Sequence, residues 1–381
     1  MTLRSSTIRI AAVGDVALMQ RPSSKLWRSV LDAADARIAN LEGPITTDTS
    51  RPAEKLIRLR LPPESAGWLK ELGTTAVSLS NNHLMDWGAG GLDDTLRALG
   101  QAGVMYTGAG RDAGEAAKPA ILEVGGYKIA LLSWASTIPT GFRATDVRPG
   151  IAGVRIRTSL VMDPGIADEQ PGTPPWVRTE PLPEDLGRLE DSVRQARAAA
   201  DCVILAMHWG VPPQWSSAFQ GPVAEYQAAV ARRAAAAGVS AIVGHHCHAP
   251  YGIEVIDAEG AAGAAAVPVL YSLGNYIFHP EYQPGGLDFS PGLLPYKATL
   301  LPENHQSCAA MLELKPAAEG LRVARVTLHP AIMNEVGEAV ALAEAEALPI
   351  AERLRSFSEA RGTRVRVEGG AMVWEAAGGE R

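Results

Sequence analysis

The stretch AIVGHHCHAP, residues Ala241 to Pro250, joins a short apolar run to three histidines within four residues. The apolar run is typical of a buried β-strand, and the glycine and proline around the histidines mark a turn. Alternating residues such as His246 and His248 can direct two ring nitrogens at one point, and neutral imidazole is the commonest transition-metal ligand. The stretch therefore predicts a strand that ends in a metal site. A polar loop whose histidines bond to neighbouring backbone is the alternative.

Other apolar runs along the chain also end in polar or glycine-containing clusters. They are Ile8 to Val13, Ala36 to Ile38, Ala76 to Leu79, Ile129 to Leu132, Cys202 to Met207 and Val269 to Leu273. Amphipathic segments between them predict helices over Ser24 to Ala33, Leu92 to Ala102, Glu184 to Ala199 and Pro222 to Ala237. This alternation predicts a layered α/β sheet, in which ligands bind beyond the carboxyl ends of the strands.

Two segments rich in proline and glycine, Pro139 to Pro183 and Pro280 to Pro295, are predicted to be long loops that act as lids or binding loops. After Glu303 the chain returns to regular patterns. These predict two antiparallel strands, a helix and a last strand, over Met311 to Leu314, Leu321 to Leu328, Ala339 to Ser358 and Arg364 to Val367. We expect residues 1–300 to form the main domain and residues 301–381 to complete it.

Composition excludes several classes of partner. The chain has 381 residues, 46% of them hydrophobic and 20% charged, and a net charge of -7 without a basic run, so we expect neither nucleic acid nor a membrane as partner. Three widely spaced cysteines fit a reducing compartment. With no signal-peptide pattern and no long apolar stretch, we expect a cytoplasmic protein. The sequence does not indicate the oligomeric state.

The strand ends together supply two carboxylates, one amide and four imidazoles: Asp15, Glu42, Asn82, His83, His208, His246 and His248. These donors are enough for two adjacent divalent cations with one bridging carboxylate. A mixed nitrogen and oxygen set is compatible with Mn, Fe, Zn, Mg or Ca.

In these motifs the sequence resembles the calcineurin-like metallophosphoesterase superfamily and, within it, the CapA-type proteins named for poly-γ-glutamate capsule synthesis. The matching motifs are Gly14-Asp15, Asn40-Leu41-Glu42-Gly43-Pro44, Ser80-Asn81-Asn82-His83 with Asp86 and Gly88, His208-Trp209-Gly210, Gly244-x-His246-x-His248 and Ser272-Leu273-Gly274-Asn275. They occur in one order over roughly residues 8 to 280. The resemblance implies an αββα sandwich with its metal site at the carboxyl ends of the strands.

The resemblance also implies roles for single residues. Asp15 and His248 would hold one metal, Asn82, His208 and His246 the other, and Glu42 would bridge them or lie just behind the ligands. His83 would occupy the position of a general acid, with Asp86 orienting it.

Each of these residues also has a structural interpretation. Asp15 and Asn82 are both common in turns, and His83 is equally compatible with a hydrogen-bonded place in the core. We expect Trp209, His245 and Asn275 near the substrate, although packing beneath His208 would explain Trp209, and a turn cap would explain Asn275.

Departures from the family pattern bear on the reaction. Phosphoesterases of the superfamily usually carry D-x-H at the first motif, whereas Asp15 is followed by Val16 and Ala17. CapA-type proteins usually have an N-terminal membrane anchor, and usually have proline where this chain has Cys247. The fold is inherited, but the chemistry need not be.

The sequence is similar to one cytoplasmic branch, the metal-dependent peptide epimerases of lasso-peptide biosynthesis. Such an enzyme inverts a Cα centre of a precursor peptide, and cations would stabilise the charge that forms when the Cα proton leaves. It needs an acid or base on each face of the carbon. We expect His83 on one face and His245, Cys247, Asp86 or His279 on the other, although Cys247 would equally suit a small packing position. The alternatives are a phosphoester or amide hydrolase, and a factor that binds poly-γ-glutamate without turnover.

Overall fold

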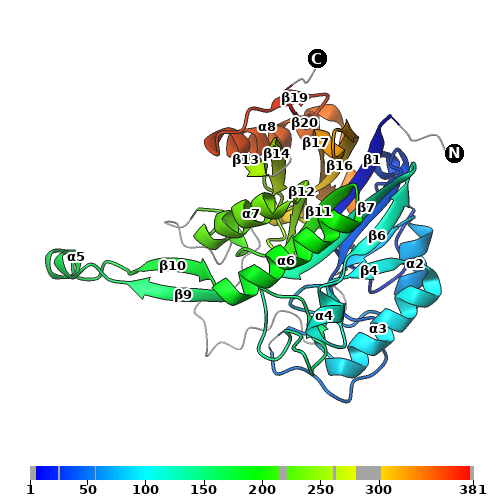
Figure 1. The fold of residues 1–381 in the computed structure, drawn as a ribbon, viewed down its shortest axis with the longest axis horizontal. Coiled ribbons are helices and arrows are strands. Elements are labelled where there is room, and N and C mark those ends of the chain that lie inside the picture. Colours follow the sequence, from blue (N-terminus) through cyan, green and yellow to red (C-terminus); the bar gives the residue numbers. More distant parts are fainter. Residues whose placement is uncertain are drawn as a thin grey trace.

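The computed structural model describes residues 6–24, 26–55, 57–213, 221–260, 263–279 and 302–377. Two β-sheets pack face to face, and helices cover their outer faces (Figure 1). The predicted layered α/β fold is therefore confirmed, in the form of an αββα sandwich. Among the described residues, no helix is long and apolar enough to cross a membrane.

The first sheet has the strand order β19-β20-β17-β16-β1-β2-β3-β4, with β15 beside β1 and β18 beside β17. Strand β1 runs parallel to β2 and antiparallel to β16, so the chain after residue 305 extends the sheet that begins at the N-terminus. The bounds are β1 Ile8–Ala17, β2 Ala36–Leu41, β3 Ala76–Ser78, β4 Met105–Thr107, β15 Asn275–Phe278, β16 Gln306–Ala317, β17 Gly320–Met333, β18 Ala339–Ala341, β19 Arg366–Glu368 and β20 Ala371–Glu375.

The second sheet has the order β13-β14-β12-β11-β7-β6, and β7, β11, β12 and β14 run parallel to one another. Its bounds are β6 Ala120–Val124, β7 Tyr127–Ala135, β11 Cys202–His208, β12 Ala241–His245, β13 Ile253–Gly260 and β14 Gly263–Leu270. Two short strands, β5 Ala109–Gly110 and β8 Gly150–Ile151, pair separately.

Alternating side chains along the central strands build three apolar layers. Ile10 of β1 and Ile204 of β11 point between the sheets, whereas their neighbours Val13 and Leu205 point outward to the helices. Strands buried on both faces read as continuous apolar runs, which is why they were predictable. The helices are α1 Ser29–Asp32, α2 Ser65–Glu71, α3 Gly88–Ala102, α4 Ala113–Ala116, α6 Pro183–Ala199, α7 Glu225–Ala237 and α8 Glu344–Ala360, with a 3₁₀ turn η3 at Pro302–His305.

Three predicted segments differ from the structure. The helix expected over Ser24 to Ala33 is reduced to α1, because the preceding backbone bonds to the C-terminal part of the chain: Trp27 N donates to Ala339 O at 2.9 Å. The helix expected from Ala339 begins only at Glu344, since Ala339–Ala341 pair with β17. The loop expected over Pro139 to Pro183 contains a β-hairpin, while the loop expected over Pro280 to Pro295 lies outside the described residues.

Gly14 gives a test of how tightly the sheet is built beside the polar strand ends. A Cβ atom at this residue would lie 1.8 Å from the carbonyl oxygen of Gly274, to which Asp15 N donates. We expect Gly14→Ala to lower the free energy of unfolding by about 3 kcal/mol, because backbone has to move. The control is Gly187→Ala in α6, where a Cβ meets nothing within 4 Å. It should stabilise by about 0.5–1 kcal/mol. Urea unfolding measures both, and equal midpoints would contradict the close approach.

Candidate metal centre

Glu42 follows β2 and is completely buried at the carboxyl ends of the strands. Its Oε1 atom lies 3.9 Å from Nε2 of His83, 4.0 Å from Nε2 of His208 and 3.9 Å from Nε2 of His248. Neither carboxylate oxygen accepts a hydrogen bond from the described residues. Burial, with a further contribution from Asp15, raises the pKa of this carboxyl well above its ordinary range. A buried carboxylate without a donor is costly unless a cation compensates it.

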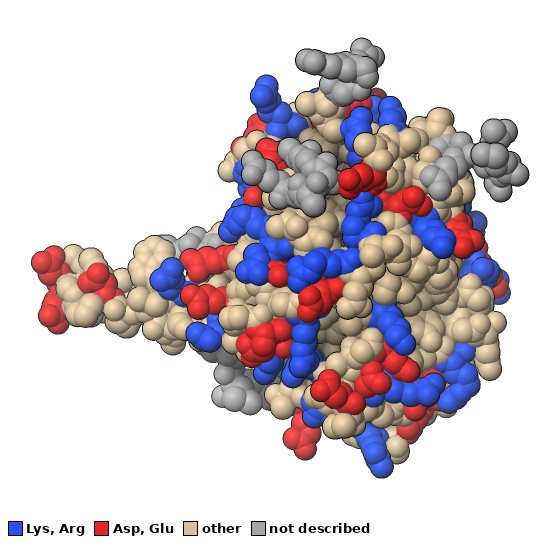
Figure 2. All heavy atoms as spheres, viewed as in Figure 1, with Lys and Arg blue, Asp and Glu red and all other residues tan. Residues whose placement is uncertain are grey.

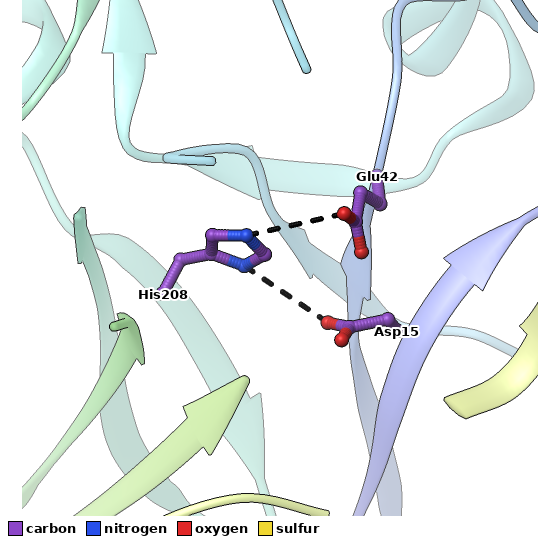
Figure 3. A group of neighbouring side chains, drawn as sticks. All are labelled: Asp15, Glu42 and His208. Carbon is purple, nitrogen blue, oxygen red and sulfur yellow. Dashed lines mark ion pairs between the residues drawn. The ribbon is translucent and has the colours of Figure 1, made fainter. Parts of the chain in front are cut away.

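Asp15 and His208 approach Glu42 from the two different sheets (Figure 3). One ligand atom of each of the three residues lies within 4.8 Å of the others, and His208 Nδ1 is 4.0 Å from Asp15 Oδ1. Asp15 lies in β1 where the pairing with β15 shifts register, and His208 is the last residue of β11. The sandwich thus brings both sheets to one polar point.

The other three predicted ligands join this group. Asn82 Oδ1 is 2.8 Å from His208 Nε2, and His248 Nδ1 is 3.5 Å from Asp15 Oδ2. The ring of His246 lies 4.8 Å from that of His208 and 6.0 Å from that of His248, measured between centroids. Its Nδ1 atom is buried without a partner among the described residues. All six predicted ligands therefore gather at one place.

The turn after β12 sets the two neighbouring imidazoles in position. His246 and His248 have φ angles of 90° and 52°, in the left-handed region that residues other than glycine seldom occupy. His246 N donates to Asp15 Oδ2 at 3.1 Å, which holds the turn against β1. Such backbone strain is typical of functional sites.

The donor chemistry fits a divalent metal. Two carboxylates, one amide and three imidazoles surround the point, and Glu42 has two buried oxygens without donors. Desolvation lowers the pKa of His208 and of His246 well below the ordinary value, so both rings are neutral, as metal ligands must be.

His83 lies beside this group, and a carboxylate on the side of its ring away from Glu42 holds the ring in place. Its Nδ1 atom is 2.7 Å from Asp86 Oδ2, an oxygen that also accepts a hydrogen bond from Leu59 N. That contact leaves Nε2 facing Glu42. Burial lowers the pKa of His83, and Asp86 partly opposes the effect. The predicted pair of His83 and Asp86 is thus present as a hydrogen-bonded unit.

Two residues of the site were missed from the sequence. Lys55 Nζ donates to Asp86 Oδ1 at 2.8 Å and to the carbonyl oxygen of Asn82, and lies 3.2 Å from His83 Nδ1. Asn40 Nδ2 donates to Asp15 Oδ1 at 2.8 Å and lies 3.3 Å from His208 Nδ1. Asn40 lies within a motif that had been recognised, but Lys55 comes from a loop without any pattern.

Other candidates do not meet the metal group as expected. Cys247 points the opposite way from the neighbouring histidines: its thiol contacts Trp209 O at 3.5 Å, and burial raises its pKa to about 12. Trp209 is buried and stacks on Tyr271, so it packs rather than binds substrate. We therefore assign neither residue to catalysis or substrate binding. For Cys247 the physical reason is the alternation of side chains along the turn after β12, which directs Cys247 into the core while His246 and His248 face the metal group.

Three further candidates have specific partners. His245 is buried, with Nε2 3.2 Å from the carbonyl oxygen of Val13. His279 Nδ1 accepts from Met19 N, and its Nε2 lies 3.3 Å from Glu338. Both ring nitrogens of His279 thus have partners, which weighs against a role in proton transfer, whereas Nδ1 of His245 is buried without a partner among the described residues. Asn275 Oδ1 lies 2.7 Å from His248 Nδ1 and so orients a ligand.

The fold and site define an αββα protein with a buried cluster of Asp, Glu and His side chains that could hold a metal ion. The model of the family "Bacterial capsule synthesis protein PGA_cap" matches residues 9–280, and the chain belongs to this family. It is 28% identical over 251 residues to the capsule biosynthesis protein CapA of Bacillus anthracis, which covers 65% of this chain and 51% of the relative. It is also 28% identical over 287 residues to a "Probable polyglutamine synthesis accessory protein" of Mycobacterium tuberculosis, covering 70% and 65% respectively.

The chain spans about half the length of the curated relatives from Sinorhizobium fredii and B. anthracis that it matches. Among solved structures, the calcineurin-like phosphoesterase YfkN from Bacillus subtilis aligns with 13% identity and a TM-score of 0.42. That alignment covers 94% of this chain and 99% of the other.

The variant Glu42→Gln tests whether Glu42 serves metal binding at the expense of the stability of the metal-free protein. Because the folded pKa is raised above the ordinary value of 4.5, the metal-free protein should lose stability as the pH rises from 4.5 through the folded pKa. Glu42→Gln removes that loss, so the metal-free variant should be at least as stable as wild type at pH 7.5. It should also bind Mn²⁺ or Zn²⁺ at least about 10-fold more weakly.

Thermal melting with and without chelator measures the first effect, and metal titration the second. A variant that keeps full metal affinity would show that Glu42 is not a ligand. Glu335→Gln, which removes the same charge at an exposed residue that is not a candidate ligand, is the control.

Proposed function

We propose that this protein is a divalent-metal-dependent enzyme that acts on a peptide. Its reaction would be the inversion of one Cα centre, L to D, in a ribosomally made precursor peptide of the lasso type, without an organic cofactor. The supporting observation is that His83, fixed by Asp86, faces the buried carboxylate of Glu42 at the centre of the ligand group.

We assign the ligand group to two cations that share Glu42, as the family resemblance implies. Asp15 and His248 would hold one cation, and Asn82, His208 and His246 would hold a second. The cations, when bound, would withdraw electron density from a carboxylate or carbonyl oxygen of the peptide and so acidify the adjacent Cα–H. Ion identity is left open by the mixed nitrogen and oxygen donors.

His83 would move the proton. With Nδ1–H donated to Asp86, Nε2 carries the free lone pair and faces the ligand group. Burial lowers the pKa of the ring, so this basic form prevails at neutral pH. Asp86 fixes both the orientation of the ring and its tautomer.

Lys55 would hold this arrangement together. Its ammonium group joins the carboxylate that orients His83 to the backbone carbonyl of Asn82, a candidate ligand. Phe142 lies 5.4 Å from Nζ, so the cation is partly enclosed. Movement of Lys55 would therefore displace the base and a ligand together.

A specific observation favours hydrolysis as the second candidate. Of the three imidazoles within 4.0 Å of Glu42 among the described residues, only His83 is not a candidate ligand. Inversion by two bases needs a group on each face of the carbon, whereas hydrolysis of a phosphoester or amide needs one acid for the leaving group. The relatives are named for capsule biosynthesis and for polyglutamine synthesis, and a polymer-binding factor without turnover is the remaining alternative.

Hydrogen exchange in heavy water tests the reaction. We expect the metal-loaded protein to exchange one Cα hydrogen of a precursor peptide encoded beside its gene, with a gain of about 1 Da and no fragments. His83→Gln should lower the rate by at least about 100-fold, because proton transfer is lost, while metal content stays near that of wild type. Mass spectrometry measures exchange, and chiral amino-acid analysis locates the inverted residue.

Each other outcome identifies an alternative. Release of phosphate from an aryl phosphate, or of peptide fragments, without Cα exchange would favour the hydrolase. Binding of polyglutamate with neither reaction would favour the polymer factor. Full exchange by His83→Gln would refute the role of this residue but leave the reaction standing.

Lys55→Met tests the link between base and ligand. We expect exchange to slow by about 10- to 100-fold, the usual cost of losing a partner that orients a ligand or a base. Metal affinity should fall as well, because Asn82 loses its backbone partner. Lys70→Met, which removes an ammonium bound to the Gly103 carbonyl of an exposed helix end, is the matched control and should leave both unchanged. Wild-type rates for Lys55→Met would remove Lys55 from the site.

A further inference from the structure

A β-hairpin projects from the body of the molecule (Figure 1). It consists of β9, Ile156–Val161, and β10, Trp176–Pro181, with the short helix α5, Pro164–Glu169, near its tip. These two strands pair with each other and with no other described strand. We call residues 155–181 the arm.

The base of the arm is firmly attached. Arg155 donates to Asp185 of α6 at 2.6 Å, and Tyr226 N of α7 donates to Thr179 Oγ1 at 3.4 Å. Beyond the base, no such hydrogen bond joins the arm to another part of the described chain, and every residue of β9 after Ile156 is exposed. The arm is therefore a fixed projection with a free outer half.

The outer half exposes large apolar side chains. Trp176 and Val161 lie opposite each other on one face and are 65% and 41% exposed, while Leu160 is 69% exposed on the other. Met162 and Ile166, nearer the tip, are 51% and 46% exposed. A two-stranded ribbon is marginally stable in water, and several large apolar side chains exposed on it indicate an interaction site.

Charge is distributed unevenly along the arm. Acidic side chains gather at the tip, where Asp163, Asp168 and Glu169 are exposed (Figure 2). Exposed arginines, Arg157 and Arg178, lie on the strands nearer the base. Glu180 pairs with Arg157 at 3.9 Å, so the base keeps a net positive charge from these three side chains.

We propose that the arm is a self-association surface, and that two copies of the chain lay their arms side by side in opposite directions. A two-fold axis brings the same patch of both copies together. In this orientation the acidic tip of each arm meets the arginines of the other, whereas a parallel arrangement would oppose like charges. Trp176 and Val161 lie between the arginines and the tip, so the two-fold axis brings this apolar pair opposite the same pair of the other copy, where the exposed rings can pack.

Sedimentation of the full chain tests the dimer, independently of any enzymatic reaction. Two narrow arms form a small interface, so we expect a dissociation constant in the micromolar range, seen between about 1 and 100 μM. Asp168→Lys with Glu169→Lys should raise this constant by at least about 10-fold, as should Arg157→Glu with Arg178→Glu. The four substitutions combined should restore most of the affinity, because the charges are exchanged.

Controls and contradicting results are well defined. Asp93→Lys with Glu335→Lys makes the same charge change at exposed residues away from the arm and should leave the dimer unchanged. Circular dichroism confirms that each variant is folded. A wild-type chain that stays monomeric to about 100 μM, or a dimer that withstands both pairs of charge reversals, would overturn the proposal.

Discussion

The buried carboxylate of Glu42 is the constraint on which the site depends. It is completely buried, accepts no hydrogen bond from the described residues, and faces three imidazole Nε2 atoms at 3.9–4.0 Å. Proteins seldom bury a carboxylate unless a cation or hydrogen-bond donors compensate for the loss of its hydration. Here the surrounding rings are kept neutral by desolvation, so they offer lone pairs rather than positive charge. The buried polar side chains around Glu42 therefore have the charge and the lone pairs of a cation-binding site.

The sandwich makes this arrangement possible because its two sheets end at the same place. Asp15 comes from β1 of one sheet and His208 from β11 of the other, and Asn40 touches both through one amide group. The apolar layer between the sheets ends just before these residues, with Ala12 and Ala206 as its last members on the two strands. Strands thus fix Asp15 and His208, while among the described residues other than glycine only His246 and His248, in the turn after β12, have positive φ angles.

The sequence was most informative where burial imposes a pattern. Doubly buried strands such as β11 read as apolar runs, and a polar residue at the end of such a run stands out, which is how His208 was found. Lys55 had no such signal, since a lysine in an irregular loop has the same appearance whether it faces solvent or Asp86. Cys247 had two interpretations, a reactive thiol or a small packing residue, because sequence adjacency to two histidines does not say which way a side chain points; its burial and its contact with Trp209 O favour packing. The hairpin of the arm was missed because its exposed strands show no apolar run.

The balance of charge around Glu42 also bears on the substrate. Lys55 Nζ lies 2.8 Å from Asp86 Oδ1, so its charge is mainly matched there and only partly offsets that of Glu42, whose pKa it lowers. Two carboxylates then face the two divalent cations that we propose, which leaves positive charge in excess. A substrate that brings a carboxylate, or that develops negative charge as a proton leaves its Cα atom, would restore the balance and bind more tightly as the charge forms. The same excess would favour a neutral His83 as the base that we propose, because a permanently cationic group next to Glu42 would compete with the cations for the carboxylate and would take up no proton.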